Sequence, residues 1–125
     1  MEILIHHKST QPIYEQIVQQ VKEMIMTGEL KPGDPIASVR ALAKELRVGV
    51  LTVQKAYDRL QQEQIIESVV GKGSFVSNKN ISGIEAQREQ IIEAKALELI
   101  ELSEKYKVSK QELFNLIETL CDHEG

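Results

Sequence analysis

The residues of this sequence best suited to chemistry are cations, which lie beside a helix cap and inside a glycine turn. Arg40 follows Ser38 by two residues, and Lys72 lies between Gly71 and Gly73. A guanidinium can bind phosphate oxygens in a bidentate manner, and an ammonium binds them as a point charge. A hairpin turn needs no lysine to close, whereas a hairpin that enters a phosphate-lined groove gains from a cation at its tip. These residues point to the binding of a polyanion.

The sequence offers no arrangement typical of catalysis or of a metal centre. It shows no nucleophile beside a base, no glycine loop of the phosphate-binding type before a helix, and no paired carboxylates in a plausible pocket. His6 and His7 are adjacent near the N-terminus, and only the distant Cys121 and His123 add further ligand types. We therefore expect no enzyme activity, no metal and no cofactor.

Three helices are predicted before the glycine turn, and they position Arg40 and the other cations of that part of the chain. Apolar periodicity predicts a helix over residues 11–27, with Pro12 in its first turn and Gly28 ending it. A second helix is expected after the N-cap Ser38, and a third ends near residues 62–64. Because the last two are separated only by the short break Arg47-Val48-Gly49, the pattern is that of a helix-turn-helix.

A β-hairpin is predicted directly after the third helix. Residues 65–70 are rich in β-branched side chains, and residues 74–77 form a second short run beyond the glycine turn. The two glycines permit positive φ and leave a slim tip. The predicted fold is thus mainly α with a small β-hairpin, a winged helix-turn-helix domain over residues 1–79.

The third helix is expected to present polar side chains on the face opposite its apolar stripe. Thr52 and Lys55 lie in its first turns, where they reach bases or phosphates, while Arg59 is placed to reach the backbone. Gln54, on the flank, has the donor and acceptor needed to bind adenine. The candidate DNA-binding residues are Ser38, Arg40, Leu51, Thr52, Gln54, Lys55, Arg59, Lys72 and Gly73.

Residues 80–125 are predicted to form a two-helix dimerisation module. A helix of about six turns covers residues 84–106, and Ser109 and Glu112 form a capping box for a last helix, with Val108 and Leu113 as its hydrophobic staple. Two such helices carry more apolar surface than they can bury alone, so a second copy is expected to cover it; the alternative is a monomer whose helices fold back on the first domain. The candidate dimerisation residues are Ile84, Ile91, Ile92, Leu99, Leu102, Leu113, Leu116, Ile117 and Leu120.

Charge and composition limit the classes of protein to which this chain can belong. The 125 residues carry a net charge of −4, divided into +1 over residues 1–79 and −5 over residues 80–125. An acidic chain usually argues against nucleic-acid binding, but the near-neutral first part can still hold a local basic face. No apolar run approaches the length of a membrane span or signal peptide, and one cysteine closes no intrachain disulfide, so a cytoplasmic protein is expected.

Several fragments in the same order resemble the GntR family of bacterial transcriptional regulators. They span roughly residues 10–77, and the short two-helix tail resembles the YtrA-like branch. The fragments begin at Pro12-Ile13-Tyr14, Gly28-Glu29-Leu30, Ser38-Val39-Arg40, Thr52-Val53-Gln54 and Gly71-Lys72-Gly73. The resemblance implies a DNA-binding homodimer, typically a repressor and often of transporter operons, and it implies that Arg40 contacts DNA.

The sequence departs from the family pattern at four places. The family usually has proline where Ala37 stands, and glycine is common at the positions of Arg47 and Gln64. Many members also begin the third helix with polar residues, whereas this chain has Gly49-Val50-Leu51. Here Val50 or Leu51 is placed to contact a thymine methyl group instead of making hydrogen bonds to a base.

We therefore expect a sequence-specific DNA-binding regulator that binds a roughly palindromic operator as a homodimer, with double-stranded DNA as its partner. An unidentified small-molecule effector remains open. The alternative is a winged-helix module that binds a protein through the apolar start of the third helix and does not bind DNA.

Overall fold

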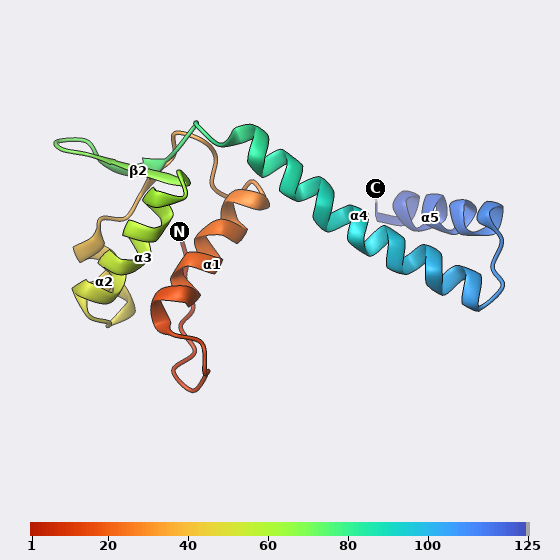
Figure 1. Cartoon of the computed structure of the whole chain (residues 1–125), viewed down its shortest axis with the longest axis horizontal. Helices are drawn as coiled ribbons and strands as arrows, with labels where there is room; N and C mark the ends of the chain where they lie inside the picture. Colours follow the sequence, from red (N-terminus) through yellow and green to blue (C-terminus); the bar gives the residue numbers. More distant parts are fainter. Residues whose placement is uncertain (125) are drawn as a thin grey trace. The chain divides into compact units, whose positions relative to one another are not determined.

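The computed structural model describes residues 1–124 and is mainly helical with one small antiparallel sheet, which confirms the predicted fold class (Figure 1). It divides into two compact units that meet inside one long helix. We call Met1–Ala86 the winged unit and Gln87–Gly125 the hairpin unit.

The first helix, α1 (Ile13–Met26), starts slightly later than expected. Pro12 lies outside the helix as its N-cap, with ψ of 147°, whereas the sequence placed it in the first turn. Val21, Met24 and Ile25 are buried on one face as their spacing predicts. Gly28, with φ of +83°, follows the last turn in a conformation that a side chain would strain.

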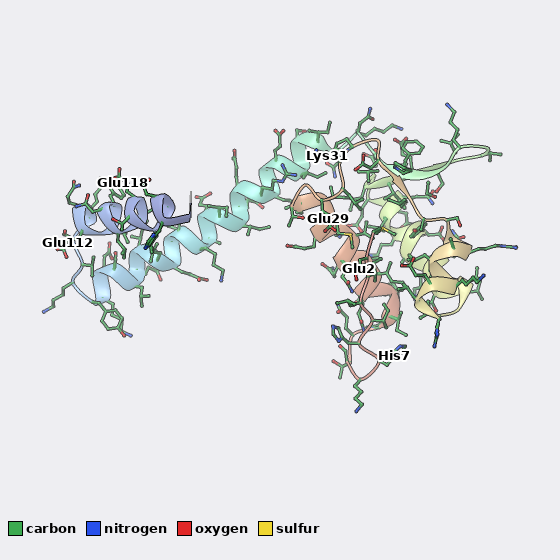
Figure 2. The ribbon with its side chains drawn as sticks, turned by 180° about the vertical axis from the view of Figure 1, so that it is seen from behind. Glu2, His7, Glu29, Lys31, Glu112 and Glu118 are labelled. Carbon is green, nitrogen blue, oxygen red and sulfur yellow. The ribbon has the colours of Figure 1, made fainter. Side chains whose placement is uncertain are left out.

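The N-terminal segment runs beside α1 and is held by two glutamines of that helix; Glu2 and His7 are labelled on the segment in Figure 2. Gln20 Oε1 accepts from the Leu4 N–H at 2.9 Å, and Gln16 Oε1 accepts from the His6 N–H at 2.8 Å. The amide nitrogens of both glutamines donate back to the carbonyl groups of Leu4 and His6. The two side chains thus pair with the segment as a neighbouring strand would, which satisfies its backbone groups.

The predicted helix-turn-helix consists of α2 (Val39–Leu46) and α3 (Val50–Gln62). Ser38 caps α2 as expected, since its Oγ accepts from the Ala41 N–H at 3.1 Å. The apolar stripe of α3 is completely buried, and its members are Val53, Ala56, Tyr57 and Leu60.

The sheet has three strands, of which the sequence predicted two. The expected hairpin is formed by β2 (Ile66–Val69) and β3 (Gly73–Val76). The additional strand, β1 (Pro35–Ile36), pairs antiparallel with β3, so the order is β1-β3-β2. This strand has only two residues and follows a Pro-Gly turn. So short a segment shows no alternation of apolar and polar residues from which a strand could be predicted.

The hairpin unit contains most of α4 (Ile81–Lys105) and all of α5 (Lys110–Glu124), which runs back beside the end of α4 (Figure 1). Ser109 caps α5 through the Glu112 N–H at 3.1 Å, while its hydroxyl donates to the Glu112 carboxylate at 3.0 Å. Figure 2 shows Glu118 pointing away from α4. Ile84, one of the predicted dimerisation residues, is half-buried against the core of the winged unit.

Three helices end with a non-glycine residue in the left-handed region: Arg47 after α2, Gln64 after α3 and Lys107 after α4. At the end of α3 the Ile65 N–H donates to the Leu60 carbonyl at 2.9 Å, the long hydrogen bond of a Schellman cap. Arg47 and Gln64 stand at the two positions where the family pattern has glycine. The backbone therefore keeps the turn although the side chain strains it.

We predict that Gln64→Gly raises the free energy of unfolding by about 0.5–1 kcal/mol, because it removes left-handed strain of about 1–2 kcal/mol at some cost in unfolded-chain entropy. Urea unfolding at neutral pH measures the change. The matched control Gln62→Gly, inside the last turn of α3, should lower stability by about 1 kcal/mol. A destabilised Gln64→Gly variant would contradict this account of the cap.

We also predict an alkaline loss of stability that depends on Tyr57. Burial, reinforced by the negative charge of Glu45, raises the pKa of the Tyr57 phenol from 10.0 to about 12. Both states hold the proton below pH 10, and above it the unfolded chain loses the proton first. The free energy of unfolding should therefore fall between about pH 10 and 12, by at most about 3 kcal/mol.

Tyr57→Phe provides the control for this titration. It should remove that part of the pH dependence and cost about 1 kcal/mol at neutral pH, since the Ala37 carbonyl loses its donor. Urea unfolding of both proteins from pH 7 to 11.5 gives the two slopes. Equal slopes would assign the alkaline transition to another group.

Candidate nucleic-acid interface

In the described part of the chain, both ends of the short helix α2 present positive charge without a carboxylate partner: Arg40 in its first turn and Lys44 in its last. Arg40 and Lys44 are exposed one helical turn apart, and among the side chains of residues 1–123 neither has a carboxylate within 4 Å. The Ser38 hydroxyl oxygen is used for the cap. The sequence analysis named Arg40 as a candidate and not Lys44, which the four-residue spacing from Arg40 would have added.

A buried hydrogen bond fixes the start of α2 against α3. Tyr57 of α3 is fully buried, and its hydroxyl donates to the Ala37 carbonyl at 2.6 Å. Ala37 directly precedes the Ser38 cap, so the position of Arg40 depends on the packing of α3.

The outward face of α3 changes in character along the helix. Leu51 in the first turn is 84% exposed, and Lys55 is exposed one turn later. Asp58 follows on the same ridge, so the face becomes acidic after two turns. Thr52 is half-buried beside them. Only the first two turns of α3 therefore suit a phosphate-bearing ligand.

Two side chains of α3 are engaged within the winged unit. Lys55 Nζ lies 4.1 Å from the centre of the Tyr14 ring of α1, a cation–π contact. Arg59 lies 3.5 Å from carboxylate oxygens of both Glu15 and Glu63. Lys55 is therefore held at the surface by a neutral partner, whereas Arg59 can reach a phosphate only by leaving two carboxylates.

The predicted adenine-binding side chain, Gln54, is also partly engaged. Its Nε2 donates to Asp58 Oδ1 at 2.8 Å, one turn along α3. Its carbonyl oxygen remains available as an acceptor, and a bidentate contact with a base would require the amide to leave Asp58.

The tip of the β2–β3 hairpin has the slim geometry that its glycines predict. Gly71 and Gly73 adopt φ of +83° and +80°, and Lys72 is exposed between them. Behind the tip, Ser68 Oγ and Ser74 Oγ are 2.7 Å apart across the strands. Gln61 of α3 donates to Ser68 Oγ at 3.2 Å, which links the hairpin to the helix.

The candidate elements lie around α3, with Lys55 directed toward the Tyr14 ring of α1. In Figure 1 the hairpin tip and α2 both lie on the side of α3 that faces away from α1. The described residues contain no group of three side chains arranged to hold a metal ion. None of the described helices has the length and apolar character needed to cross a membrane.

A helix-turn-helix followed by a cation-tipped hairpin defines a winged helix-turn-helix protein. The chain belongs to the gntR family of bacterial regulatory proteins, whose model matches residues 13–76. This is a family of regulators and not of enzymes, as the sequence predicted.

Similar proteins agree with this assignment. The chain is 48% identical over 75 residues to the HTH-type transcriptional repressor YtrA of Bacillus subtilis, covering 60% of this chain and 58% of that protein. The structure of YtrA from Sulfolobus acidocaldarius, a GntR-family transcription factor, is 40% identical, with a TM-score of 0.58 over 76% of this chain and 96% of that one. The AraR DNA-binding domain in complex with operator ORX1 is 26% identical, with a TM-score of 0.54 over 62% and 96% of the two chains.

The match to the Bacillus subtilis repressor thus spans less than two thirds of that protein. The similarity of the chain to two YtrA proteins confirms the predicted resemblance to the YtrA-like branch.

Proposed function

We propose that this chain is a sequence-specific DNA-binding transcriptional regulator that represses transcription by binding a roughly palindromic operator as a homodimer. The observation that carries the proposal is the set of exposed cations without carboxylate partners at the start of α2 and at the hairpin tip, beside Lys55 of α3. A relative that is 48% identical is a transcriptional repressor, and a fold relative has been crystallised on its operator.

The distribution of ion pairs supports DNA as the ligand. Lys22, Arg59 and Lys79 are paired with glutamates of the winged unit, so their charge is largely neutralised. Within the described residues, Arg40, Lys44 and Lys72 have no such partner. Although the net charge over residues 1–79 is only +1, these three cations lie on α2 and at the tip of the β2–β3 hairpin. Phosphates are the ligand that such cations attract.

The exposed apolar side chains of the hairpin unit, which holds α5 and most of α4, support the homodimer. Among residues 87–123 only Leu113 is buried, at 6% exposure, although the two helices carry many large apolar side chains. Those exposed by 39% or more are Ile91, Ile92, Leu97, Leu99, Ile100, Leu102, Tyr106, Phe114, Leu116, Ile117 and Leu120. So many exposed apolar side chains are stable in water when a second copy covers them, and a two-fold axis pairs the same face of each chain.

The dimer would bring two winged units to one operator. Two recognition helices related by a two-fold axis match half-sites about one helical turn, or a multiple of it, apart. A cavity of about 240 Å³ lies in the hairpin unit, with Ile100, Val108, Leu113 and Phe114 in its lining. It falls below the range of about 300–1,000 Å³ typical of ligand sites, so we assign no effector to it.

Arg40→Ala should weaken binding to all DNA sequences by a similar factor and lower the slope of log affinity against log salt by about one unit, because one phosphate contact is lost. Operators selected from a random DNA pool, titrated by fluorescence anisotropy between about 50 and 200 mM salt, provide the measurement. Lys95→Ala, which removes an equal charge from an ion pair on α4, is the control and should leave the slope unchanged.

An unchanged slope for Arg40→Ala would remove this residue from the phosphate contacts. A wild-type chain that is not retained on a DNA column at low salt would overturn the proposed function and favour a protein-binding module. Retention that is lost by about 0.3 M salt supports DNA binding.

Ile92→Glu should convert the homodimer into single chains at micromolar concentration, because it places an unpaired carboxylate within an apolar interface. Ile92 is 69% exposed in the single chain, so the substitution should leave the fold intact. Sedimentation velocity distinguishes the two states. Gln90→Glu adds the same charge on the opposite side of α4 and should remain a dimer.

The same measurement tests the assembly itself. A wild-type protein that sediments as single chains at micromolar concentration would refute the homodimer. A dimeric Ile92→Glu variant would refute only the assignment of Ile92 to the interface.

A further inference from the structure

Leu51 is exposed to a degree that the fold of its own unit does not explain. Its side chain is 84% exposed in the first turn of α3, while the stripe of Val53, Ala56 and Leu60 on the same helix is fully buried. The large exposed apolar residues of α4 and α5 belong to the proposed dimer interface, but Leu51 lies in the winged unit. Together with the neighbouring Val50, which is 47% exposed, Leu51 gives the start of α3 an apolar surface.

The first turn of α3 offers almost no polar side chain for hydrogen bonding. The N-cap Gly49 has no side chain and makes no side-chain cap, and Val50 is apolar and 47% exposed. Thr52 is half-buried, with its backbone N–H bonded to the Gly49 carbonyl. In the first turn of α3, expected at base edges, the Thr52 hydroxyl is therefore the one side-chain group among residues 49–52 that can make a hydrogen bond, and Val50 and Leu51 offer only apolar contact.

The charges around Leu51 favour DNA as the occupant over a protein. Lys55 lies one turn further on the same ridge, and Arg40 and Lys44 extend from α2, which packs against α3. Among the side chains of residues 1–123 none of these three cations is paired with a carboxylate. An apolar side chain on an element that also carries cations without carboxylate partners suits a duplex, where apolar groups of bases are flanked by phosphates.

We propose that Leu51 contacts the C5-methyl group of a thymine in the major groove and so selects thymine at one base pair of each half-site. The thymine methyl is the one major-groove feature that an aliphatic side chain recognises by contact. The inference rests on the proposed function and deepens it, since it assigns the base preference to an apolar contact.

The test removes the Leu51 side chain, the thymine methyl group, and then both together. Operators selected from a random pool are synthesised with each thymine replaced in turn by uracil, which deletes only the methyl group. Wild type should bind about fourfold more weakly per half-site when the contacted thymine is replaced, as expected for about 0.8 kcal/mol per buried methyl-sized group. Leu51→Ala should lose a similar factor on the thymine operator and should not distinguish thymine from uracil.

Leu4→Ala provides the matched control. Leu4 is also an exposed leucine, in the N-terminal segment beside α1, so the substitution removes the same atoms elsewhere. This variant should keep both the affinity and the preference for thymine over uracil. Circular dichroism of the two variants verifies that the fold is retained.

The outcomes separate the inference from the proposed function. If wild type binds the selected DNA but no uracil replacement weakens it, or if the two losses are additive, the role of Leu51 is wrong while DNA binding stands. Selected half-sites that contain no thymine would refute the role of Leu51 in the same way. A chain that binds no DNA overturns both.

Discussion

The burial of one apolar stripe on α3 is the constraint on which the rest of the structure depends. Val53, Ala56, Tyr57 and Leu60 are completely buried, so the rotation of the helix about its axis is fixed. That rotation turns Leu51 outward and brings Lys55 onto the ring of Tyr14 in α1. Through the Tyr57 hydroxyl the same stripe holds the residue before the α2 cap. The packing of the core therefore sets the orientation of the side chains in the candidate interface, and no further interaction is needed to orient them.

Much of this arrangement could be predicted from spacing alone, because an amphipathic helix encodes its buried face in sequence order. The cap at Ser38, the buried stripe of α3 and the glycine geometry of the hairpin are local properties and were predicted. The strand β1 was not, since its two residues become a strand only by pairing with β3. The contact between Arg59 and Glu15 was not predicted either. Glu15 is 44 residues away in the sequence, and its approach depends on how α1 packs against α3.

The left-handed helix ends keep their backbone conformation although glycine is the residue type that best suits it. Arg47 and Gln64 keep the positive φ that glycine would adopt without strain. The hydrogen bonds of the cap and the packing on both sides outweigh a strain of about 1–2 kcal/mol at each site. Non-glycine residues at these two positions thus maintain the turn between α2 and α3 and the turn that leads from α3 into β2.

Affinity and base selection are assigned to different chemistry at this surface. In the proposed complex, cations such as Arg40 and Lys72 would interact with phosphates that every duplex carries, so they would contribute affinity that falls with salt and carries little sequence information. Leu51 contributes little to attraction at a distance, because an apolar contact acts only when the surfaces meet. In the proposed complex Asp58 would disfavour phosphates beyond the first two turns of α3, because it is negatively charged and exposed. A weakly charged unit of this kind gains its preference for one site from close apolar contact, and its two-fold assembly would double the effect of each contact.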